Sequence, residues 1–334
     1  MSTDELAFAR ESIAALLARH DDADVWEALD EGGWLDLVPA QGHWENAAFV
    51  AEALDVIGAE AHSIAYAPHV AATATFAEMG VDAPLRPLAL ALDPVRRVDG
   101  ARVRLWGEAS AATALVDLGE DGLAVVSAAA WNPAQPGDDL LEPVMVYWAD
   151  IDLSAATPLE MDRAGLARHR ARVAYVLAAE AAGAVRSAAL RTVEYLKARR
   201  AFGVTLSSFQ ALQHRAVDIY AESLLADALV SEATARMRSG DDASHAAWAA
   251  KAFVGDRGTW AIENAIQLHG GIGFTWELGL HFGLRRTQRA RLLGGAVEQT
   301  AREVLASRSA QRAARLTAVT DWSERALPDK AVLQ

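Results

Sequence analysis

Two short runs in the C-terminal half of the chain have side chains suited to holding a phosphorylated, flat ligand. The first run has Arg199, then Phe202 and Gly203, and then Gln210. A guanidinium offers a fork of donors to a diphosphate, and an aromatic ring can cover the edge of an adenine or a flavin. An ordinary helix end with basic capping residues and a glycine stop would have the same composition, so this second interpretation stays open.

The second run extends from Gln267 to Gly273 and contains Gly270 and Gly271. Glycines let a ligand approach the backbone closely, and the glutamine amide can both donate and accept a hydrogen bond at a ribose or a ring edge. Glycine-rich helix ends are common in proteins. The run is not a dinucleotide-binding fingerprint either, because no strand precedes it.

The composition of the 334 residues narrows the possible functions. Apolar residues make up 52% and charged residues 23%, which is ordinary for a globular protein with a sizeable core. Alanine is abundant and favours helices. The net charge of −14 and the pI near 5.1 argue against binding to nucleic acid or to an anionic membrane surface.

Several kinds of site are excluded by residue type and spacing. The chain has no cysteine, so it has no disulfide, catalytic thiol or thiolate metal site. The nine histidines show no metal-ligand spacing. The N-terminus does not read as a signal peptide, and no uninterrupted apolar run is long enough to span a bilayer. We therefore expect a cytoplasmic protein without a metal.

The elements that must position the two runs are mainly helices. Residues 4 to about 80 read as short helices behind a cap at Ser2 or Thr3, one of which runs from Ala47 to Ile57 and stops at Gly58. From about 160, apolar spacing of three or four residues predicts four long helices, the last with Val297, Ala301, Val304 and Leu305 on one face. Four long helices joined by short turns predict an antiparallel bundle.

Between these helical parts the period changes to that of strands. Four short apolar runs predict strands near residues 103–106, 114–118, 123–126 and 144–148. Asp121-Gly122 is a hairpin signal, and residues 132–139 read as a loop. The segment predicts a small sheet.

The combination, order and spacing of the two runs resemble the acyl-CoA dehydrogenase family. The resemblance is strong over about residues 165–310 and includes Lys251, and it is looser over residues 1–80. It implies a mainly α fold with a small β domain. The expected parts are an N-terminal helical domain (1–82), a shortened middle β domain (83–155) and a C-terminal antiparallel four-helix bundle (160–320).

The resemblance also implies a shared flavin site. In this family FAD lies across a subunit interface, and one subunit holds the adenosine-diphosphate end of the flavin of its neighbour. Carried over residue by residue, that contribution falls on six positions of this chain. They are Arg199, Phe202, Gln210, Gln267, Gly270 and Gly271.

The catalytic half of the family's site is missing from the sequence. The family's glutamate base falls on Gly294, and the alternative base position on an earlier helix falls on about Val173. The threonine that usually follows the glutamate is Ala296, and residues 80–115 lack the family's flavin-wrapping Thr-Glu-Pro segment. A general base typically contributes 10²–10⁴-fold to a rate, so its loss would be decisive.

We therefore expect the short, base-lacking subunit of an α2β2 acyl-CoA dehydrogenase, which resembles those of actinobacterial steroid degradation. A full-length subunit would supply the glutamate and most of the flavin pocket. The implied ligands and partners are FAD, a bulky acyl-CoA and an electron-accepting flavoprotein. Two alternatives stay open: a self-sufficient homodimer that uses a displaced carboxylate such as Glu180, with Glu194 a second candidate, or a non-redox binding module on the same fold.

Overall fold

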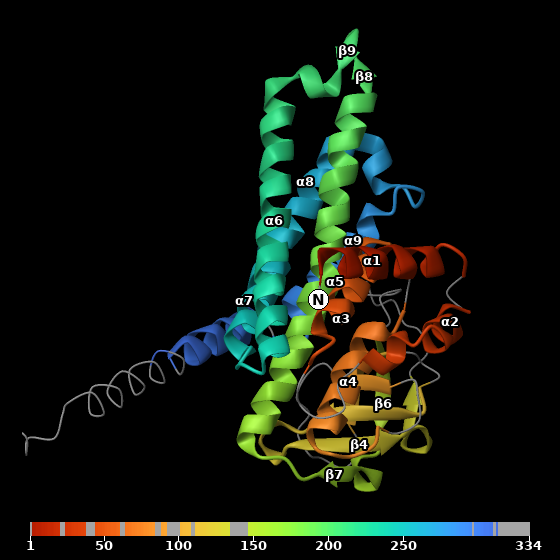
Figure 1. Ribbon diagram of the computed structural model, residues 1–334, viewed down its shortest axis with the longest axis vertical. Coiled ribbons are helices and arrows are strands. Elements are labelled where there is room, and N and C mark those ends of the chain that lie inside the picture. Colours follow the sequence, from red (N-terminus) through yellow and green to blue (C-terminus); the bar gives the residue numbers. More distant parts are fainter. Residues whose placement is uncertain are drawn as a thin grey trace, which may run out of the picture.

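A computed structural model of the chain describes residues 2–20, 24–37, 44–60, 64–83, 88–91, 101–107, 111–133, 146–295, 297–309 and 312. Figure 1 shows a β-sheet at one end of the molecule, short helices beside it, and a bundle of long helices that extends away from it. The prediction of a mainly α protein with a small sheet is confirmed. Of the loop predicted at residues 132–139, residues 134–139 lie outside the described residues, and residues 132 and 133 belong to a strand.

Four helices and one 3-10 turn (η1, Trp34–Leu37) precede the sheet, as the apolar spacing predicts. They are α1 (Thr3–Leu17), α2 (Val25–Glu31), α3 (Ala47–Ala59) and α4 (Tyr66–Glu78). Ser2 caps α1: its hydroxyl accepts from the Glu5 N–H, and the Glu5 carboxylate accepts from the Ser2 N–H.

The predicted end of α3 at Gly58 is wrong. The helix continues through Gly58 to Ala59, and Glu60 is its extended C-cap. Gly58 instead lies where α3 crosses the long helix α5 (Arg163–Ala198), and a Cβ at this position would be 1.8 Å from the Glu180 carbonyl oxygen. Gly183 of α5 lies equally close to Asp55 of α3, so the two glycines let the two backbones touch.

The sheet has seven strands in the order β5-β6-β2-β1-β3-β4-β7, and only the β1–β3 pair is parallel. The strands are β1 (Leu88–Ala91), β2 (Ala101–Trp106), β3 (Thr113–Asp117), β4 (Leu123–Ser127), β5 (Trp131–Pro133), β6 (Val146–Ile151) and β7 (Thr157–Leu159). The hairpin predicted at Asp121-Gly122 is present: β3 and β4 are joined through a 3-10 turn, and Gly122 has a φ of 90°. The sequence patterns missed β1, β5 and β7, which have three or four residues each.

The bundle is formed by helices that pack on α5. Its members are α5, α6 (Gln210–Ser239), α7 (Ser244–Phe253) with α8 (Thr259–His269), and α9 (Leu280–Leu292). A π-helical turn (Val254–Gly258) divides the predicted third helix into α7 and α8. The fourth bundle helix is α9, which the apolar spacing missed because α9 carries four arginines.

The helix at residues 297–309 lies beside the bundle and extends away from it (Figure 1). It contacts α7 through Thr300, which accepts from Lys251, and through Ser307, which lies 3.1 Å from His245. Its predicted apolar face is only partly buried: Val297 and Leu305 are 53% and 64% exposed, whereas Val304 packs against the main core. Since α9 packs on α5 as the fourth helix of the bundle, the prediction that the helix at residues 297–309 is that fourth member is wrong.

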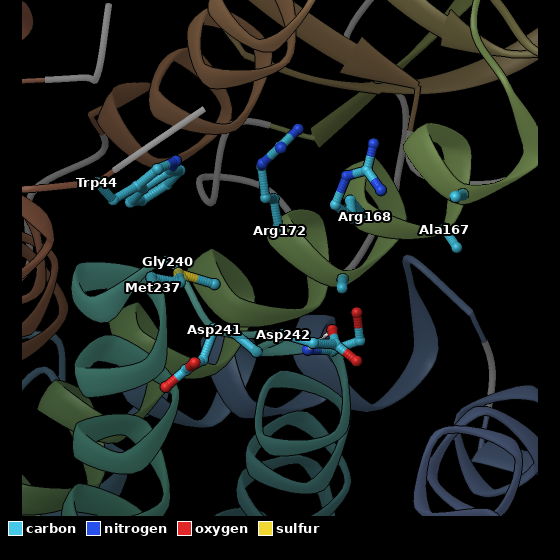
Figure 2. A pocket seen from close by; sticks show the side chains of 12 residues that line it. Trp44, Ala167, Arg168, Arg172, Met237, Gly240, Asp241 and Asp242 are labelled. Carbon is cyan, nitrogen blue, oxygen red and sulfur yellow. Dashed lines mark hydrogen bonds between the residues drawn. The ribbon is translucent and has the colours of Figure 1, made fainter. Parts of the chain in front are cut away.

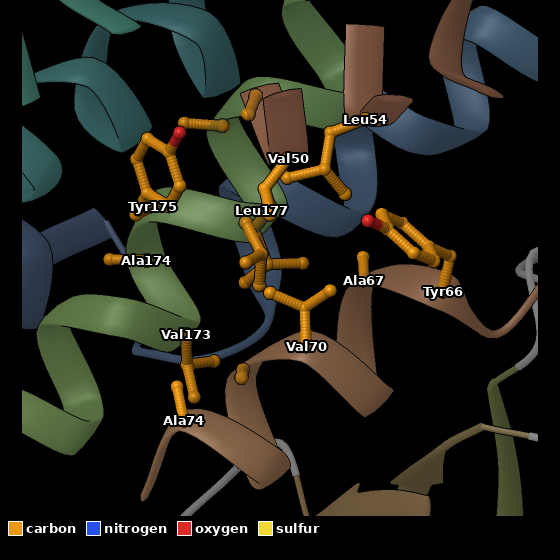
Figure 3. Packing of buried hydrophobic residues seen from close by; sticks show 14 of the residues in the cluster. Val50, Leu54, Tyr66, Ala67, Val70, Ala74, Val173, Ala174, Tyr175 and Leu177 are labelled. Atoms are coloured by element: carbon orange, nitrogen blue, oxygen red, sulfur yellow. The ribbon is translucent and has the colours of Figure 1, made fainter. Parts of the chain in front are cut away.

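The main core joins the N-terminal helices to the middle of α5. Figure 3 shows Val173, Tyr175 and Leu177 of α5 packed with residues of α3 and α4. Although α5 is long and apolar enough to cross a membrane by composition, 83% of its most apolar stretch is buried inside the protein. It is the central core helix.

Candidate functional site

The six residues predicted to hold the diphosphate end of a flavin gather at the end of the bundle away from the sheet (Figure 1). Arg199 is the C-cap of α5 and Gln210 is the first residue of α6. Between them a short hairpin pairs β8 (Arg200–Ala201) with β9 (Val204–Thr205). Gln267 lies in the last turn of α8.

All six residues are exposed. The Phe202 side chain is 95% exposed and has a φ of 53°, a left-handed conformation that a residue with a Cβ seldom adopts. Gly270 has a φ of 62°, and a Cβ built there or at Gly271 would meet no atom within 4 Å. The backbone at both glycines is open to a ligand. Exposed donors beside an open backbone fit a group that another chain holds.

Contacts with Tyr195 bring the two runs together. Its backbone oxygen accepts from the Arg199 N–H (2.8 Å), and its hydroxyl donates to the His269 carbonyl oxygen (3.3 Å). The two rings are stacked, with centroids 4.4 Å apart. The residues on each side of the hairpin and those after α8 are therefore parts of one surface.

The two positions predicted for the base lie in contact with each other in the interior. A Cβ built at Gly294 would be 3.3 Å from Val173 Cγ1 and 2.8 Å from Leu177 Cδ1. Gly294 also has a φ of 63°, which disfavours any side chain. Ala296, which follows the glycine pair, lies outside the described residues. Neither described position carries a carboxylate.

The cavity beside Gly294 is only about 20 Å³, close to the volume that one water molecule occupies. A three-ring flavin does not fit into it. Its lining includes three polar residues that the sequence patterns missed, namely Asp117, His169 and Arg170. Asp117 is the one acid among the described lining residues, and Arg170 binds both of its oxygens (2.7 and 2.9 Å).

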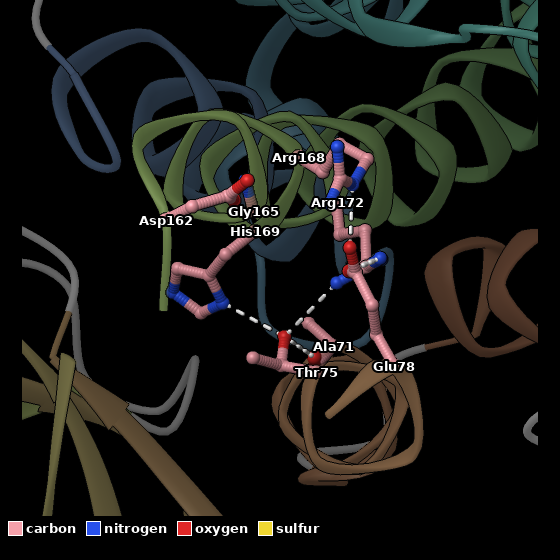
Figure 4. Close-up of polar contacts among 8 residues, drawn as sticks. All are labelled: Ala71, Thr75, Glu78, Asp162, Gly165, Arg168, His169 and Arg172. Carbon is pink, nitrogen blue, oxygen red and sulfur yellow. Dashed lines mark hydrogen bonds and ion pairs between the residues drawn. The ribbon is translucent and has the colours of Figure 1, made fainter. Parts of the chain in front are cut away.

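The imidazole of His169 is a weak proton acceptor near neutral pH, because its pKa is lowered. Burial lowers the pKa of His169 to about 4, so the imidazole is already neutral, and its Nδ1 lies 2.9 Å from Thr75 Oγ1 (Figure 4). The sequence contains a signal for the polar cluster formed by Asp117, His169 and Arg170. Residues 168–172 read Arg-His-Arg-Ala-Arg near the start of α5, and a run of cations in a buried helix requires carboxylate partners.

A buried lysine closes the loop that contains Gly294. Lys251 is 1% exposed, and its ammonium donates to the Gly295 carbonyl oxygen (2.6 Å) and to Thr300 Oγ1 (2.9 Å). Hydrogen bonds from a buried ammonium are strong because the charge has little water. Lys251 therefore holds residues 293–295 against α7.

Glu180, the displaced carboxylate considered above, lies in a buried ion cluster. Its Oε1 accepts a hydrogen bond from Arg286 Nε (3.0 Å), its Oε2 forms an ion pair with Arg289 (2.6 Å), and all three side chains are at most 5% exposed. Burial alone would raise the pKa of Glu180, but the two guanidiniums outweigh it and hold the pKa below its usual value. Arg289 also stacks on Trp106 of β2, 4.4 Å from the ring centroid. A carboxylate paired with two buried guanidiniums is held in its charged form and is shielded from solvent. The second carboxylate, Glu194, is exposed and pairs with Lys197.

A larger cavity of about 440 Å³ lies at the other end of the bundle, among α5, the α6–α7 turn and Trp44 (Figure 2). Arg168 and Arg172 are on one wall, and Asp241 and Asp242 face them. Both arginines pair with Glu78 of α4 (Figure 4). The charged side chains that line this cavity are thus two arginines and two aspartates, and the two guanidiniums share the carboxylate of Glu78. Among the described residues no three His, Asp or Glu side chains gather in a way that could hold a metal ion.

Comparison with known proteins identifies the C-terminal half of the chain. Residues 164–310 match the family described as acyl-CoA dehydrogenase, C-terminal domain. Acyl-CoA dehydrogenase IpdE2 of Mycobacterium tuberculosis is 38% identical over 133 residues, which are 40% of this chain and 39% of that protein. Acyl-CoA dehydrogenase FadE34 of the same organism is 37% identical over 126 residues, 37% of this chain and 18% of that protein. The aligned part of the chain thus spans about two fifths or less of these relatives.

Solved structures share the fold over almost the whole chain. A variant of the Tcur3481-Tcur3483 steroid ACAD has a TM-score of 0.76 and 22% identity, and the match covers 93% of this chain and 99% of that one. Butyryl-CoA dehydrogenase from Megasphaera elsdenii has a TM-score of 0.70 and 17% identity, with coverage of 92% and 98%. Residues 164–310 therefore match the acyl-CoA dehydrogenase C-terminal domain, and the chain as a whole has the fold of these solved acyl-CoA dehydrogenase structures.

Proposed function

We propose that the chain is the non-catalytic subunit of a flavin-dependent acyl-CoA dehydrogenase, and that it completes the FAD site of a full-length partner in an α2β2 complex. The observation that carries the proposal is the contact between Gly294 and Val173. Both base positions of the family meet at one point, and no described side chain there provides a free carboxylate. The cytoplasm is the proposed location.

The exposed end of the bundle supports the proposal that this chain completes the FAD site of its partner. Arg199 and Gln267 would contact the diphosphate end of FAD, and the open backbone at Gly270 and Gly271 would let the cofactor approach. When bound, FAD supplies the hydride acceptor for introducing an α,β double bond into the acyl-CoA. This chain's own residues bind and orient the cofactor, and the partner removes the proton.

Exposed apolar side chains support a requirement for a partner. Val217 and Leu224, two turns apart on α6, are 65% and 51% exposed, and Val297 and Leu305 project from the helix at residues 297–309. Exposed apolar surface of this kind is typical of protein interfaces. Light scattering on the chain alone should show aggregates or homo-oligomers, whereas co-expression should give a defined heteromer. A stable monomer of the lone chain at high concentration would contradict this expectation.

We infer that the substrate of the complex is a bulky, steroid-derived acyl-CoA. The support is the likeness to IpdE2 and to the Tcur3481-Tcur3483 steroid ACAD. The proposed electron acceptor is a flavoprotein. The tight interior around Gly294 supports an acyl pocket on the partner.

Two measurements test the proposal. The chain is purified alone and with a full-length acyl-CoA dehydrogenase that has the glutamate, and each preparation is supplied with FAD and a panel of CoA thioesters. We expect no reduction of an artificial electron acceptor by the lone chain, and about two flavins per active heterotetramer. Turnover by the lone chain above about 1 s⁻¹, which is within the ordinary enzyme range, would overturn the proposal. An active complex with four flavins would also overturn it.

The alternatives give different results in the same experiment. A homodimer that used Glu180 would turn over alone and lose that activity in Glu180→Gln. A non-redox module would give a complex whose flavin content and activity equal those of the partner alone. A matched control replaces the partner's glutamate with glutamine, which should abolish activity and leave the flavin count unchanged.

A further inference from the structure

We propose that Tyr195 and His269 are positioning residues of the FAD half-site, and that together they fix Arg199 relative to the backbone of Gly270 and Gly271. This inference rests on the proposed function. It assigns a role to a stacked pair that lies next to the exposed residues and does not itself need to touch the cofactor.

Tyr195 has one contact with each of the two runs. Its backbone oxygen accepts from the N–H of Arg199, which ends α5. Its hydroxyl reaches α8 and donates to the carbonyl oxygen of His269, the residue before Gly270. Tyr195 therefore links the position of Arg199 to that of the backbone at Gly270.

His269 is held in a single orientation and protonation state. It is 3% exposed, and its Nδ1 lies 2.8 Å from the Ala265 carbonyl oxygen. A carbonyl oxygen only accepts, so Nδ1 carries a hydrogen, and burial lowers the pKa of His269, which favours the neutral ring. The imidazole lies nearly parallel to the Tyr195 ring, at an angle of 26°. The side chain of His269 is thus fixed by Ala265 and by the Tyr195 ring, and its carbonyl oxygen by the Tyr195 hydroxyl.

The pair has a physical reason to affect binding. Arg199, Gly270 and Gly271 are exposed, and the free energy of binding includes the cost of ordering groups that move in the free protein. A rigid link beneath them lowers that cost before the cofactor arrives. Loss of the link should weaken FAD binding even though every contacting residue is still present.

The test uses the chain in its complex with the full-length partner. FAD is titrated into the apo-complex and its binding is followed by flavin fluorescence. Tyr195→Leu, which removes the stack and the hydroxyl, should lower FAD affinity about five- to tenfold. Tyr195→Phe preserves the stack and loses only a long hydrogen bond, so its affinity should fall less than about threefold.

A double variant separates positioning from general stability. If Tyr195 acts through Arg199, the loss caused by Tyr195→Leu should be clearly smaller in the Arg199→Ala background. Tyr175→Leu is the matched control, because it removes a tyrosine from the same helix about 30 Å away. It should lower the thermal stability of the complex without changing FAD affinity.

The outcomes distinguish this inference from the proposed function. Unchanged FAD affinity in Arg199→Ala would overturn the proposed function. A loss in Arg199→Ala, together with wild-type affinity in Tyr195→Leu, would overturn only the positioning role. Fully additive losses, or an equal loss in Tyr175→Leu, would overturn it as well. Should Tyr195→Leu fail to assemble, His269→Leu provides the same measurement from the other side of the stack, with the same five- to tenfold loss expected.

Discussion

The interior around Gly294 and the exposed bundle end around Arg199 have the same backbone feature in opposite surroundings. Gly294 and Gly270 have φ values of 63° and 62°. A Cβ at Gly294 would touch Leu177 and Val173, whereas a Cβ at Gly270 would meet open space. Under the proposed function, the side chains that fill the volume beside Gly294 leave no room there for a flavin, whereas the bundle end needs only exposed groups in the right places to contact a ligand of another chain.

The largest predicted effect concerns the interior charges. Glu180→Gln should lower the free energy of unfolding by about 3–5 kcal/mol, because it leaves Arg286 and Arg289 buried without their carboxylate. The control is Glu194→Gln, whose carboxylate pairs with Lys197 on the surface and should contribute less than about 1 kcal/mol. Urea unfolding at one protein concentration measures both. A Glu180→Gln effect as small as that of Glu194→Gln would mean that Glu180 is free for another role.

At the exposed end of the bundle, substitutions should change FAD affinity and leave the free energy of unfolding nearly unchanged. Arg199→Ala should lower FAD affinity of the complex about ten- to a hundredfold, since charge-assisted contacts contribute about 1.5–3 kcal/mol. Gln267→Ala should act in the same direction with a loss of about fivefold, because a neutral hydrogen bond contributes about 1 kcal/mol. Arg200→Ala is the neighbouring control: its guanidinium donates to the Gly203 carbonyl oxygen, and FAD affinity should stay within about twofold. Equal losses in Arg199→Ala and Arg200→Ala would point to general electrostatic attraction instead of a specific contact.

One substitution made in both regions sharpens the comparison directly. Gly294→Ala and Gly270→Ala each put a Cβ on a backbone with positive φ, and at Gly270 the ψ of −138° adds a conformation that only glycine readily adopts. Only the Cβ at Gly294 would meet neighbouring atoms, so a larger loss at Gly294 reports the packing there. We expect Gly294→Ala to be less stable than Gly270→Ala by roughly 1–3 kcal/mol, the usual cost of overpacking a core. Thermal and urea unfolding measure the difference. Equal losses would show that Leu177 yields without cost and that the interior is less tightly filled than the distances imply.

The smallest predicted effect is a pH dependence at the edge of the interior. Asp227 of α6 is largely buried, and burial together with the charge of Asp55 raises its pKa to about 6. Folding therefore favours the protonated form, so the stabilising contribution of Asp227 is fully present below about pH 4 and is lost as the pH rises through about 6. Asp227→Asn should stabilise the protein at pH 7 by about 1 kcal/mol and flatten its stability between pH 4 and 6. An unchanged pH profile in Asp227→Asn would assign the titration to another group.

The sequence predicted the helical parts and the exposed half-site better than the interior. Short N-terminal helices, four of the seven strands and the helix ends at Arg199 and Gly270 follow from local spacing and glycine placement, which a single stretch of chain contains. The local spacing did not predict helix α9. Its Arg286 and Arg289 are buried because they pair with Glu180, and no local pattern shows a partner about a hundred residues away.

By itself, the sequence determined which residues stand at the base positions and at the flavin-contacting positions, because residue identity needs no coordinates. Only the tertiary structure decided what surrounds them. Val173 and Gly294 are far apart in sequence, and the packing of α5 against the loop after α9 brings them into contact and fills the space between them. Burial likewise decided the state of Glu180, since the pKa and the free lone pairs of a carboxylate depend on neighbours that the fold supplies.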